Sequence, residues 1–167
     1  MLSLSWYDSP IGKLLLSAGE DALTGAWFEG QKYFPTQLPG HAAWDDLHPV
    51  LLQAKDWLAR YFSGDQPHPA ELKLAPEGSE FRRQVWDILL RIPYGQVTTY
   101  GAIAKELARL RGVRAMSAQA VGGAVGHNPI SIIVPCHRVV GADGSLTGYA
   151  GGIGKKLLLL TLEGAAL

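Results

Sequence analysis

The sequence contains a single cysteine, Cys136, among its 167 residues. One thiol cannot form an internal disulfide, and it cannot build a thiolate-rich zinc or iron–sulfur site. Cys136 is therefore either an inert side chain or a chemically active one. Long apolar runs are also missing: none approaches the ~20 residues that a membrane helix needs, and the start lacks the pattern of a secretory signal. We therefore expect a cytoplasmic protein without a membrane segment.

The chain also lacks net charge, since it has 15 Lys and Arg against 15 Asp and Glu. A neutral total argues by itself against a nucleic-acid partner, but the charges are unevenly placed. Residues 1–78 carry five Lys and Arg against ten Asp and Glu, whereas residues 79–167 carry ten against five. This polarity suits a protein whose C-terminal half alone meets a polyanion. The alternative is an accidental distribution of solvated charges.

The acidic half has the pattern of a small α/β domain. Short apolar stretches between residues 2 and 28 are separated by turn signals, which predicts an antiparallel meander. Apolar residues at helical spacing from 47 to 62, with Pro49 near the start and Gly64 just past the end, predict an amphipathic helix that packs on the sheet. Residues 65–78 contain three prolines, and the charge balance changes sign beyond them. We expect a linker there, followed by the second domain.

The basic half, residues 79–167, is predicted to be mostly helical. Four helices are expected, one capped by Ser79 and stopped by Pro93, one from Tyr100 to about Leu110 capped by Thr98 or Thr99, one from Ser117 to about Gly126, and one from Lys155 to Glu163. The second and third are short and joined by a turn, which suggests a helix-turn-helix.

The third of these helices is rich in glycine, with Gly122, Gly123 and Gly126. Each glycine costs ~1 kcal/mol of helix propensity relative to alanine, so something other than helix stability must favour it. A normal helix is about 10–12 Å across and the DNA minor groove is about 6 Å wide, so only a helix reduced to Ala and Gly could approach the groove floor. The alternative is a close contact between two helices.

The cysteine stands in a distinctive setting. A lone Cys or a lone His is more often structural than catalytic. Here Pro135 fixes the backbone before Cys136, an apolar run precedes it, and His137 and Arg138 follow at once. This predicts a rigid, electropositive surrounding that can lower the pKa of the thiol.

The run Pro-Cys-His-Arg-Val at residues 135–139 has an Asn-Pro pair before it, and Gly-Tyr-x-Gly-Gly and a Leu-Leu-x-x-x-Glu helix after it. Together these resemble the O6-alkylguanine-DNA alkyltransferases over nearly all of residues 79–167, and the N-terminal meander and helix are similar to that family's N-terminal domain. The resemblance implies an α+β fold: a ribonuclease-H-like α/β domain, then a mostly helical domain with a helix-turn-helix. It also implies a DNA repair protein that moves an alkyl group from the O6 of guanine irreversibly onto Cys136, once per molecule.

By position, the resemblance assigns a role to each matching side chain. Cys136 is the expected alkyl acceptor, His137 acts as a base toward it through a water, and Glu163 orients His137. Tyr100 is expected to donate a hydrogen bond to the guanine ring as the base leaves. Asn128 is the expected hinge between the recognition helix and an active-site strand.

The remaining expected residues bind DNA or enclose the guanine. Those expected to contact DNA are Ser117, Gln119, Ala120, Gly122, Gly123 and Arg138. Those expected to line the guanine pocket are Val125, Val139, Tyr149, Ala150 and Gly151. The implied partner is double-stranded DNA bearing O6-alkylguanine, bound through the minor groove by a monomer with no cofactor, and the damaged nucleotide must be rotated out of the stack.

Three features depart from the family pattern. Gln119 stands where the family commonly has an arginine that fills the gap left by the flipped base. The connection between the two helices, residues 109–116, is longer than usual and rich in arginine. Some members hold zinc in the N-terminal domain, but that domain has no cysteine here, so no metal is expected.

Three other functions remain as alternatives. A damage sensor of the alkyltransferase-like kind would have another residue in place of Cys136. A DNA-binding regulator that uses the helix-turn-helix alone would leave Cys136, His137 and Glu163 without a common purpose. A cysteine hydrolase would turn over and would need an oxyanion hole.

Overall fold

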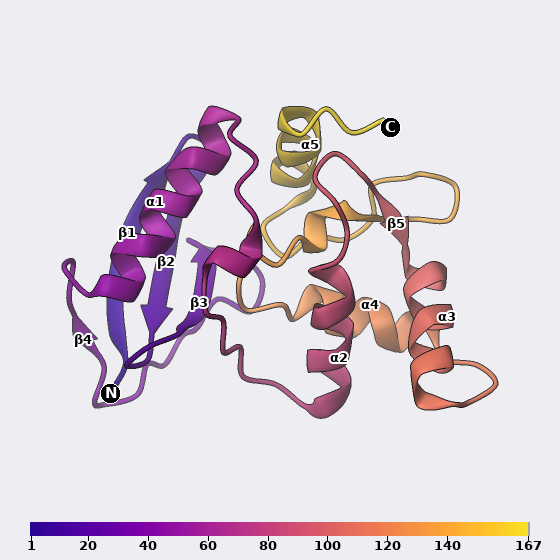
Figure 1. The fold of residues 1–167 in the computed structure, drawn as a ribbon, viewed down its shortest axis with the longest axis horizontal. Helices are drawn as coiled ribbons and strands as arrows, with labels where there is room; N and C mark the ends of the chain where they lie inside the picture. The colour runs from indigo at the N-terminus through magenta and orange to yellow at the C-terminus, as the bar shows by residue number, and fades with distance from the viewer. Residues whose placement is uncertain (167) are drawn as a thin grey trace. The chain divides into compact units, whose positions relative to one another are not determined.

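A computed structural model describes residues 1–166 of the chain, which form two compact units (Figure 1). The first unit comprises Met1–Glu77 and, from much later in the sequence, Pro129–Ile133. The second comprises Gly78–Asn128 and the residues from Val134 onward. None of the helices in the described part of the chain has the length and apolar character needed to span a membrane.

The first unit contains the expected antiparallel meander and helix. Strands β1 (Ser3–Ser9), β2 (Gly12–Ala18) and β3 (Leu23–Phe28) pair in sequence, and β4 (Ala43–Trp44) adds a short parallel pairing with β1. Helix α1 (Pro49–Ser63) packs on β1 and β2 and covers one face of the sheet (Figure 1). Its apolar stripe and the inward side chains of β2 make the core of this unit, so the predicted meander and helix are confirmed.

Residues 65–77 belong to the first unit, and the expected linker is wrong in that respect. They contain a 3-10 turn, η1 (Pro69–Glu71). The backbone N–H of Leu23 donates to the carbonyl of Lys73 at 2.9 Å, and the N–H of Ala75 donates to the carbonyl of Leu23 at 2.8 Å. The prolines in the segment remove donors but leave every carbonyl free to accept, so the chain can still pair with β3.

The segment Pro129–Ile133 pairs with β3 at the edge of the sheet, whose strand order is β3-β2-β1-β4. The N–H of Ala26 donates to the carbonyl of Pro129, and the N–H of Ser131 donates to the carbonyl of Ala26, both at 2.8 Å. An active-site strand was expected here, but the segment makes only one isolated bridge and then turns at Ile132, whose φ is 72°. The expected strand is therefore wrong.

The second unit is helical, as expected. It contains α2 (Glu80–Leu89), α3 (Tyr100–Arg111), α4 (Ala118–Gly126) and α5 (Ile153–Leu162), together with a two-residue parallel pairing of β5 (Thr98–Thr99) and β6 (Val139–Val140). Helices α2, α3 and α4 pack on one another around apolar side chains. The predicted N-caps are confirmed, because the side-chain oxygens of Ser79, Thr99 and Ser117 each accept a backbone hydrogen bond from the first turn of the next helix.

Candidate active site around Cys136

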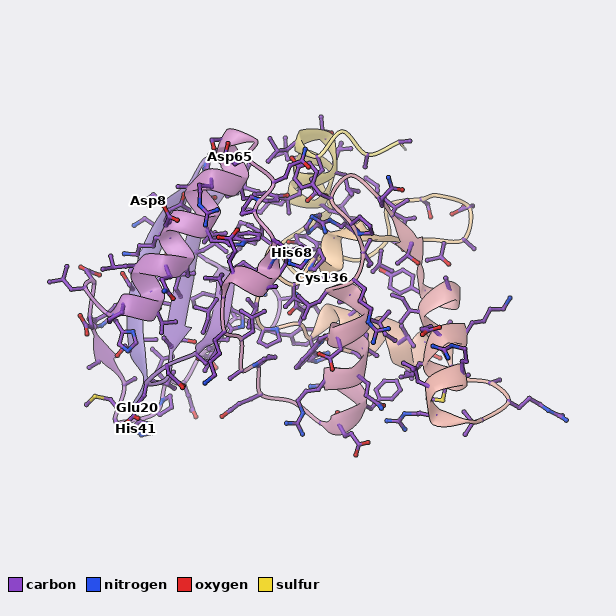
Figure 2. The ribbon with its side chains drawn as sticks, in the orientation of Figure 1. Asp8, Glu20, His41, Asp65, His68 and Cys136 are labelled. Atoms are coloured by element: carbon purple, nitrogen blue, oxygen red, sulfur yellow. The ribbon has the colours of Figure 1, made fainter. Side chains whose placement is uncertain are left out.

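Cys136 lies at the start of a 3-10 turn, η2 (Cys136–Arg138), in the second unit, and Figure 2 labels it there. Pro135 before it has φ −82° and ψ 62°, and the N–H of Cys136 donates to the carbonyl of Val134 at 2.8 Å. These are the angles and the hydrogen bond of an inverse γ-turn, which suits the fixed φ of proline. The turn places the thiol in the interior, where Cys136 is 6% exposed.

Asn128 follows the end of α4 and holds the thiol and the backbone before it. Its side chain hydrogen-bonds the thiol of Cys136, and its Nδ2 donates to the carbonyl of Val134 at 2.9 Å. Asn128 is itself buried. The residue expected to be a hinge therefore also joins the end of α4 to the turn that carries the cysteine.

Burial raises the pKa of the Cys136 thiol, against the lowering influence of the Asn128 hydrogen bond and the nearby Lys156 charge. The sequence suggested the opposite net direction, and that prediction is wrong because desolvation of the thiolate outweighs the favourable partners. The resting group is thus a thiol. A nucleophile in this state needs a base when it reacts.

His137 is paired with Glu163, the residue that caps the C-terminal end of α5. Nε2 of His137 lies 2.6 Å from Oε2 of Glu163, and both side chains are fully buried. Burial lowers the pKa of His137, although the hydrogen bond to Glu163 raises it in part. Since Glu163 is a carboxylate, Nε2 is the nitrogen that carries the proton and donates. Nδ1 is then the basic nitrogen, and it has no hydrogen-bond partner within residues 1–166.

Arg138 completes this buried cluster. Its Nε donates to Oε1 of Glu163 at 2.7 Å, its Nη2 donates to Oε2 at 3.1 Å, and its Nη1 donates to the carbonyl of Ile92 at 2.6 Å. The guanidinium also lies over the ring of Tyr94, 5.7 Å from its centroid. Burial would raise the pKa of Glu163, but the hydrogen bonds from His137 and Arg138 outweigh it and lower the pKa to about 2.

The expected contact between Arg138 and DNA is corrected by this geometry. The side chain is 8% exposed, and each of its three nitrogens donates a hydrogen bond to Glu163 or to the carbonyl of Ile92. A phosphate could be reached only by breaking a buried ion pair, which is strongly unfavourable. Arg138 is a structural partner of Glu163.

Lys156 is a site residue that the sequence analysis missed. It is fully buried on α5, and its Nζ donates to the carbonyls of Val139 at 2.5 Å, Thr147 at 2.9 Å and Gly148 at 3.2 Å. Burial lowers its pKa to about 8, against the raising influence of Cys136. The available signal was its spacing with Leu159, Leu160 and Glu163, which places it on the buried stripe of that helix.

Tyr100 and Lys156 both bind the carbonyl of Thr147, two residues before Tyr149 of the expected guanine pocket. Tyr100, at the start of α3, donates its hydroxyl hydrogen to the carbonyl of Thr147 at 3.0 Å. Burial raises the pKa of Tyr100, and a Cys136 thiolate would raise it further, so the hydroxyl keeps its proton. Of the expected pocket residues, Val125 and Val139 are buried, and Tyr149, Ala150 and Gly151 are half-buried.

Helix α4 presents its small residues to solvent. Ser117, Gln119, Ala120 and Gly123 are exposed, whereas Val121, Ala124 and Val125 are buried. A Cβ added at Gly123 or at Gly126 would meet nothing within 4 Å, and one at Gly122 would lie 3.7 Å from the ring of Tyr100, an ordinary contact. These glycines are therefore not required for close packing against another helix within this structure. Gly123 is exposed, which leaves a thin helix face open at that position.

Metal ligation has no support in the described residues 1–166, where no group of three or more His, Cys, Asp or Glu side chains could hold an ion. Among the side chains labelled in Figure 2, Asp8 belongs to β1, Glu20 to the β2–β3 turn, His41 to the loop before β4, and Asp65 and His68 to the segment after α1.

The site thus consists of one buried cysteine beside a hydrogen-bonded His–Glu pair. It lies in the helical unit, in which the short helices α3 and α4 are joined by the connection after Arg111. The family model for the DNA-binding domain of 6-O-methylguanine DNA methyltransferase matches residues 80–165, and the model for that family's ribonuclease-like domain matches residues 3–76. The chain belongs to the 6-O-methylguanine DNA methyltransferase family.

Named relatives match over nearly the whole length. A methylated-DNA–protein-cysteine methyltransferase of Methanosarcina acetivorans is 44% identical over 95% of this chain and 96% of its own, and one of Haemophilus influenzae is 41% identical over 97% and 86%. A crystal structure of the Mycobacterium tuberculosis O6-methylguanine methyltransferase has a TM-score of 0.84 at 43% identity, covering 98% of this chain and 93% of that one. A structure of the M. tuberculosis protein in complex with DNA has the same TM-score and identity, covering 96% and 92%. The expected family and the expected α+β fold are confirmed.

Proposed function

We propose that this chain is a DNA repair protein, a methylated-DNA–protein-cysteine methyltransferase that moves an alkyl group from the O6 of guanine in DNA to Sγ of Cys136. The observation that carries the proposal is the buried thiol of Cys136 followed directly by the His137–Glu163 pair, in a chain that belongs to this family. The relatives' printed activity supports the reaction type.

The first step removes the proton of the thiol. Because burial keeps Cys136 protonated at rest, a base must act as the reaction begins. Nδ1 of His137 is the nitrogen left to accept that proton, through a water as the family resemblance implies. Glu163 stabilises the imidazolium that results, and Lys156 supplies a positive charge near the developing thiolate.

The second step is an in-line displacement at the alkyl carbon. A bond forms between Sγ of Cys136 and that carbon, the bond from the carbon to O6 breaks, and its electron pair remains with the guanine. Tyr100 is the proposed donor of one proton to the guanine. The proton that His137 took from the thiol then returns to Tyr100 through solvent, so the net transfer is of the thiol proton to the guanine. The thioether product is not hydrolysed under mild conditions, so each molecule acts once.

DNA is the proposed macromolecular partner, as the complex of the M. tuberculosis relative supports. We propose that the exposed face of α4, with Ser117, Gln119, Ala120, Gly122 and Gly123, enters the minor groove. The open space beside Gly123 supports this, because a thin helix suits a narrow groove. The damaged nucleotide must leave the stack to reach a buried thiol.

The roles are proposed to divide along the chain, with residues 79–167 binding DNA and accepting the alkyl group and residues 1–78 forming a supporting α/β domain. The basic balance of the C-terminal half supports this division. A monomer and a cytoplasmic location are expectations from the sequence that stay predictions.

The test is to incubate the protein with duplex DNA that contains O6-methylguanine and to weigh the intact chain. We expect one added methyl group per molecule, located on Cys136 by peptide mapping, and no further turnover when more DNA is added. Cys136→Ser is the control, which should bind the duplex but gain no mass. Repeated turnover would indicate a hydrolase, and binding without any adduct on the parent protein would indicate a damage sensor.

A further inference from the structure

The second unit contains a groove that the alkyl-transfer reaction does not use. Its volume is about 490 Å³, and it lies between α3 and the connection that leads to α4. Small and apolar residues line most of it, together with three cations, Lys105, Arg109 and Arg114.

The groove exists because the connection is long. Gly112 ends α3 in the left-handed region, with φ 67°, and the N–H of Val113 donates back to the carbonyl of Ala108 at 3.0 Å. Residues 112–115 then run exposed beside α3 before Ser117 caps α4, and Figure 1 shows this connection as a loop beside the end of α3. A tight turn between the helices would leave no such space.

The basic residues at the end of α3 and in the connection differ in their partners within the protein. Arg109 pairs with Glu106 through contacts of 2.6 Å and 3.0 Å. Arg111 donates to Oε1 of Gln84 at 2.7 Å, and its guanidinium lies 5.3 Å from the centroid of the Phe81 ring.

Lys105 and Arg114 have no hydrogen-bond or ion-pair partner within residues 1–166, and both are exposed. Two cations without a counter-charge at one groove are available to an anionic ligand.

We propose that this groove holds the phosphodiester backbone of the bound duplex, with Lys105 and Arg114 each contacting a phosphate. Gly101 and Ala118, which also line the groove, are the sequence neighbours of Tyr100 and Gln119, the residues proposed to face the damaged base and the stack. The backbone of that same duplex is thus the polyanion within reach. The Ala and Met side chains of the lining can pack against deoxyribose carbons, while the two cations neutralise phosphates. This inference rests on the DNA repair function proposed above.

The groove has a consequence for Gln119. An uncharged glutamine contributes no charge-assisted hydrogen bond to the gap that base flipping leaves. Contacts of Lys105 and Arg114 with DNA phosphates would add affinity for the duplex that does not depend on base sequence, and so would compensate for the missing charge at position 119.

The experiment compares the parent protein with Lys105→Ala/Arg114→Ala and with Arg111→Ala, using one duplex that carries O6-methylguanine. Arg111 is the matched control, since it is an arginine at the end of α3, next to the same connection, whose side chain is held by Gln84 and Phe81. Binding is measured over a series of salt concentrations. Each lost phosphate contact reduces the slope of log K against log salt by about 0.9, so the double variant should lose about 2 from the slope and Arg111→Ala should lose none.

A double variant with the slope of the parent would overturn the proposal, and so would an equal loss in Arg111→Ala. Transfer from the free O6-methylguanine base, which has no backbone, is measured alongside. A fall on the free base as large as the fall on duplex would place the defect in the active site and would also overturn it. If the parent gains no methyl group at all, the proposed repair function fails, whatever the salt slopes show.

Discussion

Nε2 of His137 lies 2.6 Å from Oε2 of Glu163, and the same carboxylate receives two hydrogen bonds from Arg138. One buried carboxylate thus sets the proton position on the histidine and balances the charge of the arginine. The three consecutive residues therefore have different roles. Cys136 is the proposed alkyl acceptor, His137 is the proposed base, and Arg138 helps to hold the base in place through Glu163.

Glu163→Gln should slow alkyl transfer and destabilise the second unit. An amide is a weaker acceptor for the Nε2 hydrogen, so the imidazolium formed during the reaction loses its counter-charge. Arg138 keeps its charge without a buried partner, a change that typically costs ~3–5 kcal/mol. The measurements are the single-turnover rate on methylated duplex and urea unfolding. Glu106→Gln, at an exposed ion pair with Arg109, should cost no more than ~1 kcal/mol, and equal losses in the two variants would contradict the proposed role.

Stability should fall as the pH falls, because the buried cluster resists protonation. The folded-state pKa of His137 lies below its ordinary value of 6.5, and that of Glu163 lies at about 2, below 4.5. In both cases the unfolded chain binds more protons than the folded one, so stability rises with pH through these windows. The loss should begin below about 6.5 with His137 and continue from 4.5 towards about 2 with Glu163. Thermal unfolding from neutral to acid pH tests this, and Glu163→Gln should show a shallower decline in the lower window.

Local patterns were enough to predict much of the second unit. The N-caps at Ser79, Thr99 and Ser117 are confirmed because a cap depends only on a side chain and the first turn after it. The short strands β4, β5 and β6 were not predicted, because each has two residues, which are too few to show an alternating pattern.

The errors in the site have a different cause, since they depend on partners far along the chain. Arg138 could be assigned to DNA because nothing near it in sequence shows that Glu163 and Ile92 take up its donors. The carbonyls that Lys156 caps are likewise invisible in the sequence, although its burial could be predicted from the spacing in α5. The pKa of Cys136 was given the wrong direction because adjacent basic residues suggested a favourable field, whereas burial decides the shift.

Lys156→Met should slow transfer from the duplex and from the free base alike. Its ammonium group holds three carbonyls. Val139 is itself expected to line the guanine pocket, and Thr147 and Gly148 directly precede Tyr149, another expected pocket residue. Methionine fills a similar volume but donates no hydrogen bond, so these residues should shift, and a misplacement of about 1 Å can cost ~10²-fold in rate. The control is Lys155→Met at the neighbouring half-buried lysine. Lys156→Met that reacts with the free base at the parent rate would contradict this role.

Gln119→Ala should slow transfer on duplex DNA and have much less effect on the free base. A flipped nucleotide leaves a gap whose unstacking costs a few kcal/mol, and a long side chain inserted there recovers part of that cost. Gln119 is exposed in the first turn of α4, so it is free to enter such a gap. Gln119→Arg should speed transfer or tighten duplex binding, because a guanidinium stacks and hydrogen-bonds better than an amide.

The decisive comparison is the ratio of the duplex rate to the free-base rate, measured for the parent and both Gln119 variants. A side chain that repairs the stack changes this ratio, whereas one that supports the fold of α4 changes both rates together. The prediction therefore requires a ratio that falls in Gln119→Ala while the thermal stability stays within ~0.5 kcal/mol of the parent, as expected at an exposed position. If Gln119→Ala reacts with duplex as fast as the parent, Gln119 is only a surface residue of the helix, and flipping depends on contacts elsewhere on the duplex.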